Sequence, residues 1–84
     1  MLKEYRKTAI IKAEQFDGSE EMIKKYGIYK WRTFFTQNND YVYYLPTEEG
    51  DLQTWIGEWI TTDVNGEYWP IADDVFKKTY EEVD

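Results

Sequence analysis

The pair Asn65-Gly66, which lies between two runs rich in β-branched and aromatic residues, constrains the fold of this chain more than any other feature. A type I′ turn requires positive φ at both central residues, and Asn and Gly adopt that conformation most easily. A two-residue loop also sets the register of a hairpin, so Val64 is predicted to face Glu67 and Ile60 to face Ile71. The sequence therefore predicts an antiparallel hairpin over residues 60–71.

This register assigns the residues around the turn to two faces. One face is expected to be core, with Ile60, Thr62, Val64, Trp69 and Ile71. The other is mixed and expected to be half exposed, with Trp59, Thr61, Asp63, Tyr68 and Pro70. Pro70 has no N–H to donate, so Glu67–Ile71 is predicted to be an edge strand or to leave its sheet near Pro70.

The first third of the chain predicts a strand followed by a helix. Residues Lys7–Phe16 are β-branched in the middle and favour a strand. A short helix follows, with Asp17 or Ser19 as its N-cap and Gly27 as its stop. Its expected apolar stripe is Met22, Ile23 and Tyr26.

The middle of the chain predicts three further extended segments. Tyr29–Gln37 is expected to be a strand ended by a turn at Asn38–Asp40 and paired in a hairpin with Tyr41–Pro46. A turn over residues 47–51 leads to Leu52–Ile56, predicted as a strand or extended segment, and Gly57 is expected to kink the chain.

The chain is predicted to end with a helical turn over Asp73–Lys77, capped by Asp73, and then an extended tail. The sequence does not decide whether residues 79–83 form a helix or a strand. Together these elements predict one β-rich α+β domain over residues 1–84. Five or six short strands would form a strongly twisted antiparallel sheet or a small open barrel, with one short helix and a C-terminal helical turn.

Composition excludes most catalytic chemistry. The 84 residues include no Cys and no His, and the single serine, Ser19, lies where a helix cap belongs. The turn at residues 47–51 lacks the ligand spacing of a calcium loop, and the five glycines are isolated. We therefore expect no enzyme, no catalytic residue, no metal site and no cofactor.

The charge is uneven along the chain. Its net charge is -7, yet residues 1–32 carry eight basic and five acidic side chains, whereas residues 33–76 carry nine acidic side chains and no basic one. This layout argues against direct binding of nucleic acid, whose phosphates require Lys and Arg. No apolar run reaches the about 20 residues of a membrane span, and the N-terminus lacks the apolar segment of a signal peptide. We expect a cytoplasmic location.

Aromatic side chains make up 19% of the residues. They could form a stacking platform for bases, but such platforms carry a basic groove, so core packing with two or three exposed rings is favoured. Exposed rings among carboxylates are typical of protein-binding surfaces. The candidate protein-binding surface is Trp59, Asp63 and Tyr68, with the neighbouring acids Glu58 and Glu67.

The chain resembles a family of small bacteriophage and prophage proteins with an opening YRK and QF strand, a T-EG turn, a GDWI and GE-YP hairpin, and a closing D-F--TYE. The matching residues are Tyr5-Arg6-Lys7, Gln15-Phe16, Thr47, Glu49-Gly50, Gly57, Trp59-Ile60, Gly66-Glu67, Pro70, Asp74, Phe76 and Thr79-Tyr80-Glu81. The departures are Glu58, where Asp is usual, Asn65-Gly66 as the turn, and Ala9 in place of a Pro or bulky residue in the first strand. The match weakens across Ser19–Tyr44, and it implies phage origin without carrying over any catalytic or binding residue.

These observations favour a phage- or prophage-encoded accessory protein that acts without catalysis by binding an unknown protein in the bacterial host. One alternative is an acidic nucleic-acid mimic that inhibits a DNA-binding host defence protein. Another is a structural protein of the virion or a homo-oligomer, which sedimentation would test.

Overall fold

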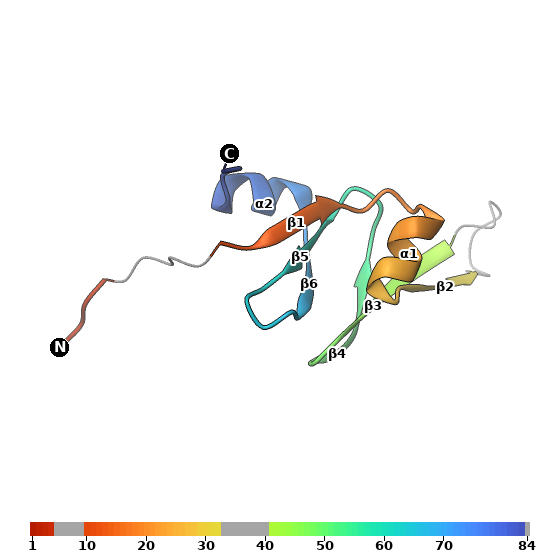
Figure 1. The fold of residues 1–84 in the computed structure, drawn as a ribbon, viewed down its shortest axis with the longest axis horizontal. Helices are drawn as coiled ribbons and strands as arrows, with labels where there is room; N and C mark the ends of the chain where they lie inside the picture. The colour runs from red at the N-terminus through yellow and green to blue at the C-terminus, as the bar shows by residue number, and fades with distance from the viewer. Residues whose placement is uncertain (5–9, 33–40, 84) are drawn as a thin grey trace.

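The computed structural model describes residues 1–4, 10–32 and 41–83. Within them the chain order is β1 (Lys12–Gln15), α1 (Glu20–Tyr26), β2 (Tyr29–Arg32), β3 (Tyr41–Thr47), β4 (Gly50–Thr54), β5 (Trp59–Thr62), β6 (Tyr68–Ile71) and α2 (Asp73–Thr79). The strands form two antiparallel sheets, β1-β5-β6 and β2-β3-β4 (Figure 1). Six strands, two helices and no closed barrel among the described strands confirm the predicted β-rich α+β class.

Helix α1 forms where local signals predict it. The Ser19 hydroxyl accepts a hydrogen bond from the Met22 N–H at 3.3 Å, which satisfies one of the free amides of the first turn. Gly27 ends the helix with a φ of 69°, a left-handed conformation that suits glycine. Met22 and Tyr26 are buried and Ile23 packs against them, so the predicted apolar stripe is confirmed.

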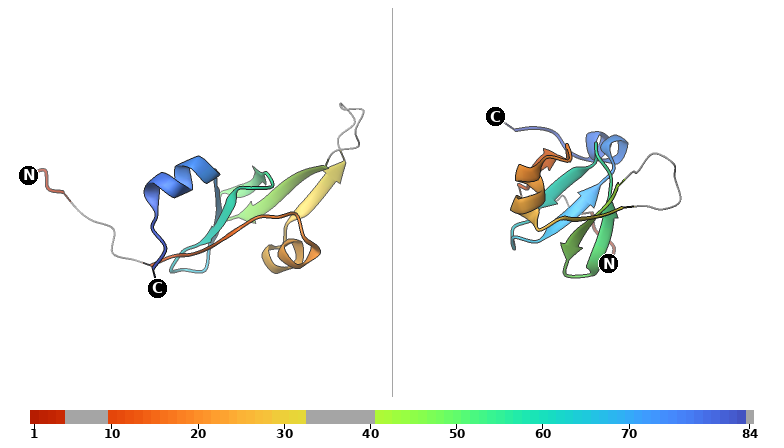
Figure 2. Two further views of the ribbon diagram at one scale, coloured as in Figure 1. Left: turned by 90° about the horizontal axis from the view of Figure 1, so that it is seen from above. Right: turned by 90° about the vertical axis from the view of Figure 1, so that its right-hand side faces the viewer.

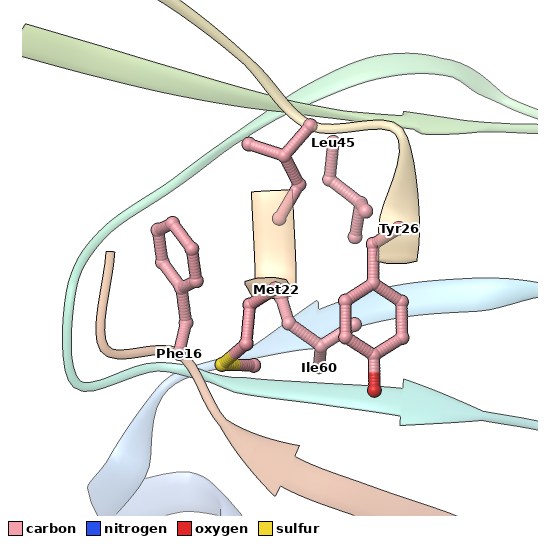
Figure 3. Close-up of a cluster of buried hydrophobic side chains, with 6 residues drawn as sticks. Phe16, Met22, Tyr26, Leu45 and Ile60 are labelled. Carbon is pink, nitrogen blue, oxygen red and sulfur yellow. The ribbon is translucent and has the colours of Figure 1, made fainter. Parts of the chain in front are cut away.

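The core lies between α1 and strands from both sheets. Figure 3 shows Met22 and Tyr26 of α1 pointing toward Ile60 of β5 and Leu45 of β3. The full buried set is Phe16, Met22, Tyr26, Ile28, Leu45 and Ile60. Each such side chain contributes roughly 1.5–3 kcal/mol when it leaves water. Since no disulfide is available, this cluster is what holds the two sheets together.

The predicted register of the β5–β6 hairpin is wrong by one residue. Ile60 lies opposite Pro70, not Ile71, and Thr62 lies opposite Tyr68. The turn therefore spans residues 63–67 in place of a two-residue loop. The Asp63 carboxylate accepts hydrogen bonds from the N–H groups of Asn65 at 2.8 Å and Glu67 at 3.0 Å. These two bonds stabilise the longer turn locally, as Asp side chains commonly do.

A shift of one residue exchanges the faces of β6 relative to β5. Tyr68 now shares the core face with Ile60 and packs against the core, whereas Trp69 is 46% exposed. Val64, also predicted as core, is 72% exposed in the turn. The prediction that the strand containing Pro70 lies at an edge is confirmed, since among the described strands β6 pairs with β5 alone in its sheet.

The C-terminal helix begins earlier than predicted and is longer. Asp73 is its first residue and not its cap, because Ala72 holds the N-cap position without a side-chain hydrogen bond. Since α2 continues to Thr79, the predicted end at Lys77 is two residues short. Tyr80 is extended, with a φ of -124°, so the tail after the helix agrees with the expectation.

The first predicted strand is shorter in the structure, since β1 covers only Lys12–Gln15 of the described residues. The segment predicted at Leu52–Ile56 is shifted toward the N-terminus, because β4 covers Gly50–Thr54, and the predicted turn over residues 47–51 is wrong, since β3 continues to Thr47 and β4 begins at Gly50. Residues 7–9 of the first strand, residues 33–37 of the second and the turn at 38–40 lie outside the described residues. Strand β4 ends at Thr54, and Trp55–Ile56 belong to the following turn, where Gly57 has a φ of 101°. The predicted pairing of the second and third strands is confirmed, with Tyr29 opposite Tyr44.

The two helices lie on opposite sides of the β1-β5-β6 sheet (Figure 2). On one side the Tyr26 ring of α1 meets the Tyr68 ring edge-on, with centroids 4.8 Å apart. On the other side Phe76 of α2 stacks on Trp59. This sheet is therefore covered on both faces, and the β2-β3-β4 sheet packs against it through β3 and β6.

Candidate functional site

Trp59, the central residue of the predicted surface, is part of the packing between α2 and its sheet. Its ring stacks on Phe76 with centroids 4.3 Å apart and planes inclined by 12°, and Phe76 stacks in turn on Tyr80 at 5.2 Å. The indole N–H donates to the Asp73 carboxylate at 2.8 Å. We call Trp59, Phe76 and Tyr80 the Trp59 stack.

Asp73 anchors this stack electrostatically. Besides the Trp59 indole, it accepts from Lys77, whose Nζ lies 3.0 Å from the second carboxylate oxygen. These two contacts, the indole hydrogen bond first, hold the pKa of Asp73 below its ordinary value. Trp59 therefore has its ring and its polar atom engaged inside the molecule.

Two of the predicted acidic residues bind the backbone of their own turns. Glu58 accepts hydrogen bonds from the Thr54 hydroxyl at 2.9 Å and from the Trp55 N–H at 3.2 Å. Asp63 accepts from two amides in the β5–β6 turn, as described above. Both carboxylates therefore stabilise turns, a role that the predicted protein-binding surface did not include.

Tyr68 and Trp59 do not form one surface. Tyr68 faces α1 on the core side of the sheet, while Trp59 faces α2 on the other side. The structure therefore divides the five predicted residues among the α2 interface, the core and the turns. Their role in protein binding stays a prediction, but substitution of Trp59 or Tyr68 would remove packing and not only a contact surface.

Glu67 belongs to a group of carboxylates at the neighbouring β3–β4 and β5–β6 turns. Its hydrogen bond with Glu48, together with partial desolvation and the charges of Glu48, Asp63 and Glu49, raises its pKa above the ordinary value. We call Glu48, Glu49, Asp63 and Glu67 the turn carboxylates. Nowhere in the described parts of the chain do three or more acidic residues adopt an arrangement suited to a metal ion.

An apolar groove of about 380 Å³ lies beside the Trp59 stack. Its lining comes from both ends of the described chain, namely Ile10, Ile11, Ala13, Trp59, Phe76, Tyr80, Glu81, Glu82 and Val83. Because the walls at Ile10 and Val83 are exposed terminal segments, the groove is open rather than enclosed.

A group of partly exposed rings lies on one face of the β2-β3-β4 sheet. Tyr29 stacks on its cross-strand neighbour Tyr44, with centroids 5.4 Å apart, and meets Trp31 edge-on at 6.4 Å. Trp31 is 64% exposed. Asp51 of β4 completes the row, since the Tyr29 hydroxyl donates to its carboxylate at 2.5 Å. This bond is the main reason that the pKa of Tyr29 is raised.

Period-two alternation explains why these rings point away from the core. Leu45 and Tyr43 face the core, so Tyr44 and Val42 on the same strand face outward. We call Tyr29, Trp31, Val42, Tyr44 and Asp51 the outer aromatic face. Sequence reasoning did not assign the rings of this region to faces. The alternation of aromatic and basic side chains in Tyr29–Arg32 is the sequence signal that could have predicted this face.

Comparison with known proteins found no match to a family model, to a curated protein or to a solved structure. In the described parts of the chain, neither helix has the length and apolar character needed to cross a membrane.

Proposed function

We propose that this protein is a small phage- or prophage-encoded accessory protein that acts without catalysis, by binding another protein in the cytoplasm of the bacterial host. The observation that carries the proposal is the outer aromatic face. Aromatic side chains are enriched at protein interfaces because they offer a large contact area at a small cost in conformational entropy. The phage assignment rests on the sequence resemblance alone.

This proposal moves the contact surface away from the hairpin of β5 and β6. Trp59 has its ring covered by α2 and its N–H bound to Asp73, so it can offer little to a partner. Trp31 has most of its surface in contact with water. An exposed ring gains more from burial by a partner than a ring that is already packed.

Affinity capture with matched variants tests the proposal. Tagged protein, Trp31→Ala and Trp69→Ala are exposed to bacterial host lysate, and the retained proteins are identified by mass spectrometry. Trp69 is the control because it is also an exposed tryptophan but lies on β6. We expect at least one protein retained by the natural chain and by Trp69→Ala to be lost with Trp31→Ala. Identical retained sets for all three would contradict the proposal.

A second candidate function, an acidic nucleic-acid mimic, is favoured by the turn carboxylates. Their mutual proximity, visible in the raised pKa of Glu67, concentrates negative charge as a phosphate track does. Under this alternative, added duplex DNA should displace the partner and Glu48→Gln with Glu67→Gln should abolish capture. Trp31→Ala should then have no effect, which separates the two functions.

A further inference from the structure

The outer aromatic face carries no positive charge of its own in the described residues. Lys30 and Arg32 alternate with Tyr29 and Trp31 along β2, so they belong to the opposite side of the sheet. Lys30 confirms this placement, because its Nζ lies 4.7 Å from the centre of the Tyr41 ring on that opposite side. Among the residues that the structure describes, no cation is therefore placed on the rings of the outer aromatic face.

Negative charge borders the same face. Asp51 lies within it, and the β3–β4 turn that precedes Asp51 contains Glu48 and Glu49. The Glu67 carboxyl reaches this turn from the β5–β6 hairpin. No Lys or Arg occurs between residues 33 and 76, so β3, β4, β5 and β6 contribute only acidic charge.

We propose that the outer aromatic face binds arginine side chains of a partner protein, with the guanidinium stacked on Tyr29, Trp31 or Tyr44 and paired with Asp51. Guanidinium groups stack on aromatic faces and pair with carboxylates through parallel N–H donors, so both features of this face suit them. This inference deepens the proposed function and rests on it. It names the chemistry of the partner.

Other occupants fit the same face less well. Nucleic acid would bring phosphates toward Asp51 and the turn carboxylates, which repel them. Two copies of the outer aromatic face would bring only acidic side chains of the described residues to the contact, so Asp51 would gain no cation as a partner. A partner segment with arginines gains from the rings and the carboxylates at once.

The direct test uses two synthetic peptides that differ only in charge. One contains three arginines separated by glycine and serine, and the other replaces each arginine with citrulline, a neutral side chain of the same shape. Binding to ¹⁵N-labelled protein is followed through the backbone amides and the Trp31 indole N–H. We expect the arginine peptide to shift signals of β2, β3 and β4, and the citrulline peptide to bind at least about fivefold more weakly.

Matched variants distinguish this face from general attraction to an acidic protein. Trp31→Ala and Asp51→Asn should each weaken binding of the arginine peptide by about fivefold, and Asn keeps an acceptor for the Tyr29 hydroxyl. Glu82→Gln removes the same single charge from the groove beside the Trp59 stack and should change affinity by less than about twofold. Trp69→Ala serves as the ring control.

Several results would overturn the inference. These are equal binding of the two peptides, signal shifts centred elsewhere, or an equal loss of affinity in Glu82→Gln and Asp51→Asn. Concentration-dependent association in sedimentation that Trp31→Ala abolishes would identify a second copy as the occupant. If capture from lysate depends on Trp31 while the arginine peptide fails to bind, the inference fails and the proposed function stands. If the peptide binds through Trp31 but no lysate protein does, only the proposed function fails.

Discussion

The Trp59 stack and the outer aromatic face contain the same kinds of residue in opposite situations. In the Trp59 stack a helix covers the rings, and the polar atom of the indole has a partner in Asp73. In the outer aromatic face the rings contact one another across two strands, and Trp31 remains 64% exposed. The difference shows that aromatic content alone does not identify a binding surface. What covers the rings decides whether they stabilise the fold or remain open to a partner.

The largest expected effect comes from removing one tryptophan from each cluster. Trp59→Ala loses the stack on Phe76 and the bond to Asp73, so we expect it to lower the free energy of unfolding by about 2–3 kcal/mol. Trp31→Ala should change it by less than about 0.5 kcal/mol, because an exposed ring contributes little. Urea denaturation at pH 7 measures both values.

Trp59→Phe is the second variant in this comparison, since it keeps a ring on Phe76 but removes the indole N–H. Its cost should be smaller than that of Trp59→Ala, because it loses only the hydrogen bond to Asp73 and keeps the ring stack. Equal destabilisation by Trp59→Ala and Trp31→Ala would show that the two clusters do not differ in the way described.

A substitution at Gly18 tests whether the two clusters unfold together. Gly18 has a φ of 76°, and a Cβ at this position would lie 2.9 Å from the Ile56 Cδ1. Gly18→Ala therefore combines left-handed strain with a close contact that the exposed Ile56 side chain can relieve by moving, and we expect the strain to account for most of a cost of about 1–2 kcal/mol. Denaturation followed separately at the indole signals of Trp59 and Trp31 should show one common shifted midpoint.

Gly66→Ala is the matched control for Gly18→Ala. Gly66 has a similar φ of 80°, but a Cβ there would meet no atom within 4 Å. Its effect should be the strain alone, about 1 kcal/mol. If the midpoints for Trp59 and Trp31 separate in Gly18→Ala, the sheets unfold independently and the prediction of one domain is wrong.

Acid should weaken the Trp59 stack as the Asp73 carboxylate becomes protonated. The pKa of Asp73 is lowered in the folded state, so its contribution to stability is present above its unfolded value near 3.8 and is lost as the pH falls through the folded value. The Trp59 indole N–H signal should move with this titration, because the indole donates to the Asp73 carboxylate. Asp73→Asn should remove the movement, and a Trp59 signal that still titrates in this variant would contradict the assignment.

The sequence predicted those elements whose signals are local. Helix α1 could be predicted from its N-cap at Ser19 and its stop at Gly27, because both signals lie within a few residues of the helix in the sequence. The hairpin of β5 and β6 also exists as Asn65-Gly66 suggests. The predicted register of this hairpin is wrong because the Asp63 carboxylate accepts hydrogen bonds from two amides of the turn, which stabilise a longer turn than the two-residue loop. The Asn65-Gly66 motif alone does not indicate these bonds.

The candidate site was harder to predict, because it depends on contacts between distant segments. Trp59 contacts Phe76 and Asp73, which lie at least 14 positions away in the sequence. No pattern within β5 predicts these contacts. The outward orientation of Tyr44 depends on which face of β3 meets α1. Alternation can divide rings into two faces, but only the packing shows which face is covered.

The smallest expected effect concerns Glu67 at the turn carboxylates. Its pKa is raised above 4.5 because the folded chain holds it beside Glu48, so the charged form is less favourable in the fold than in the unfolded chain. As the pH falls from 7 through this raised value, the folded state gains a proton before the unfolded state does, and stability increases relative to neutral pH. Glu67→Gln should therefore raise the melting temperature at pH 7 slightly and remove this gain on acidification. Glu82→Gln, with the same change in charge, should leave the gain in place. Loss of stability in Glu67→Gln at pH 7 would mean that the Glu67 carboxylate stabilises the turns. Repulsion among the turn carboxylates would then not destabilise the folded protein.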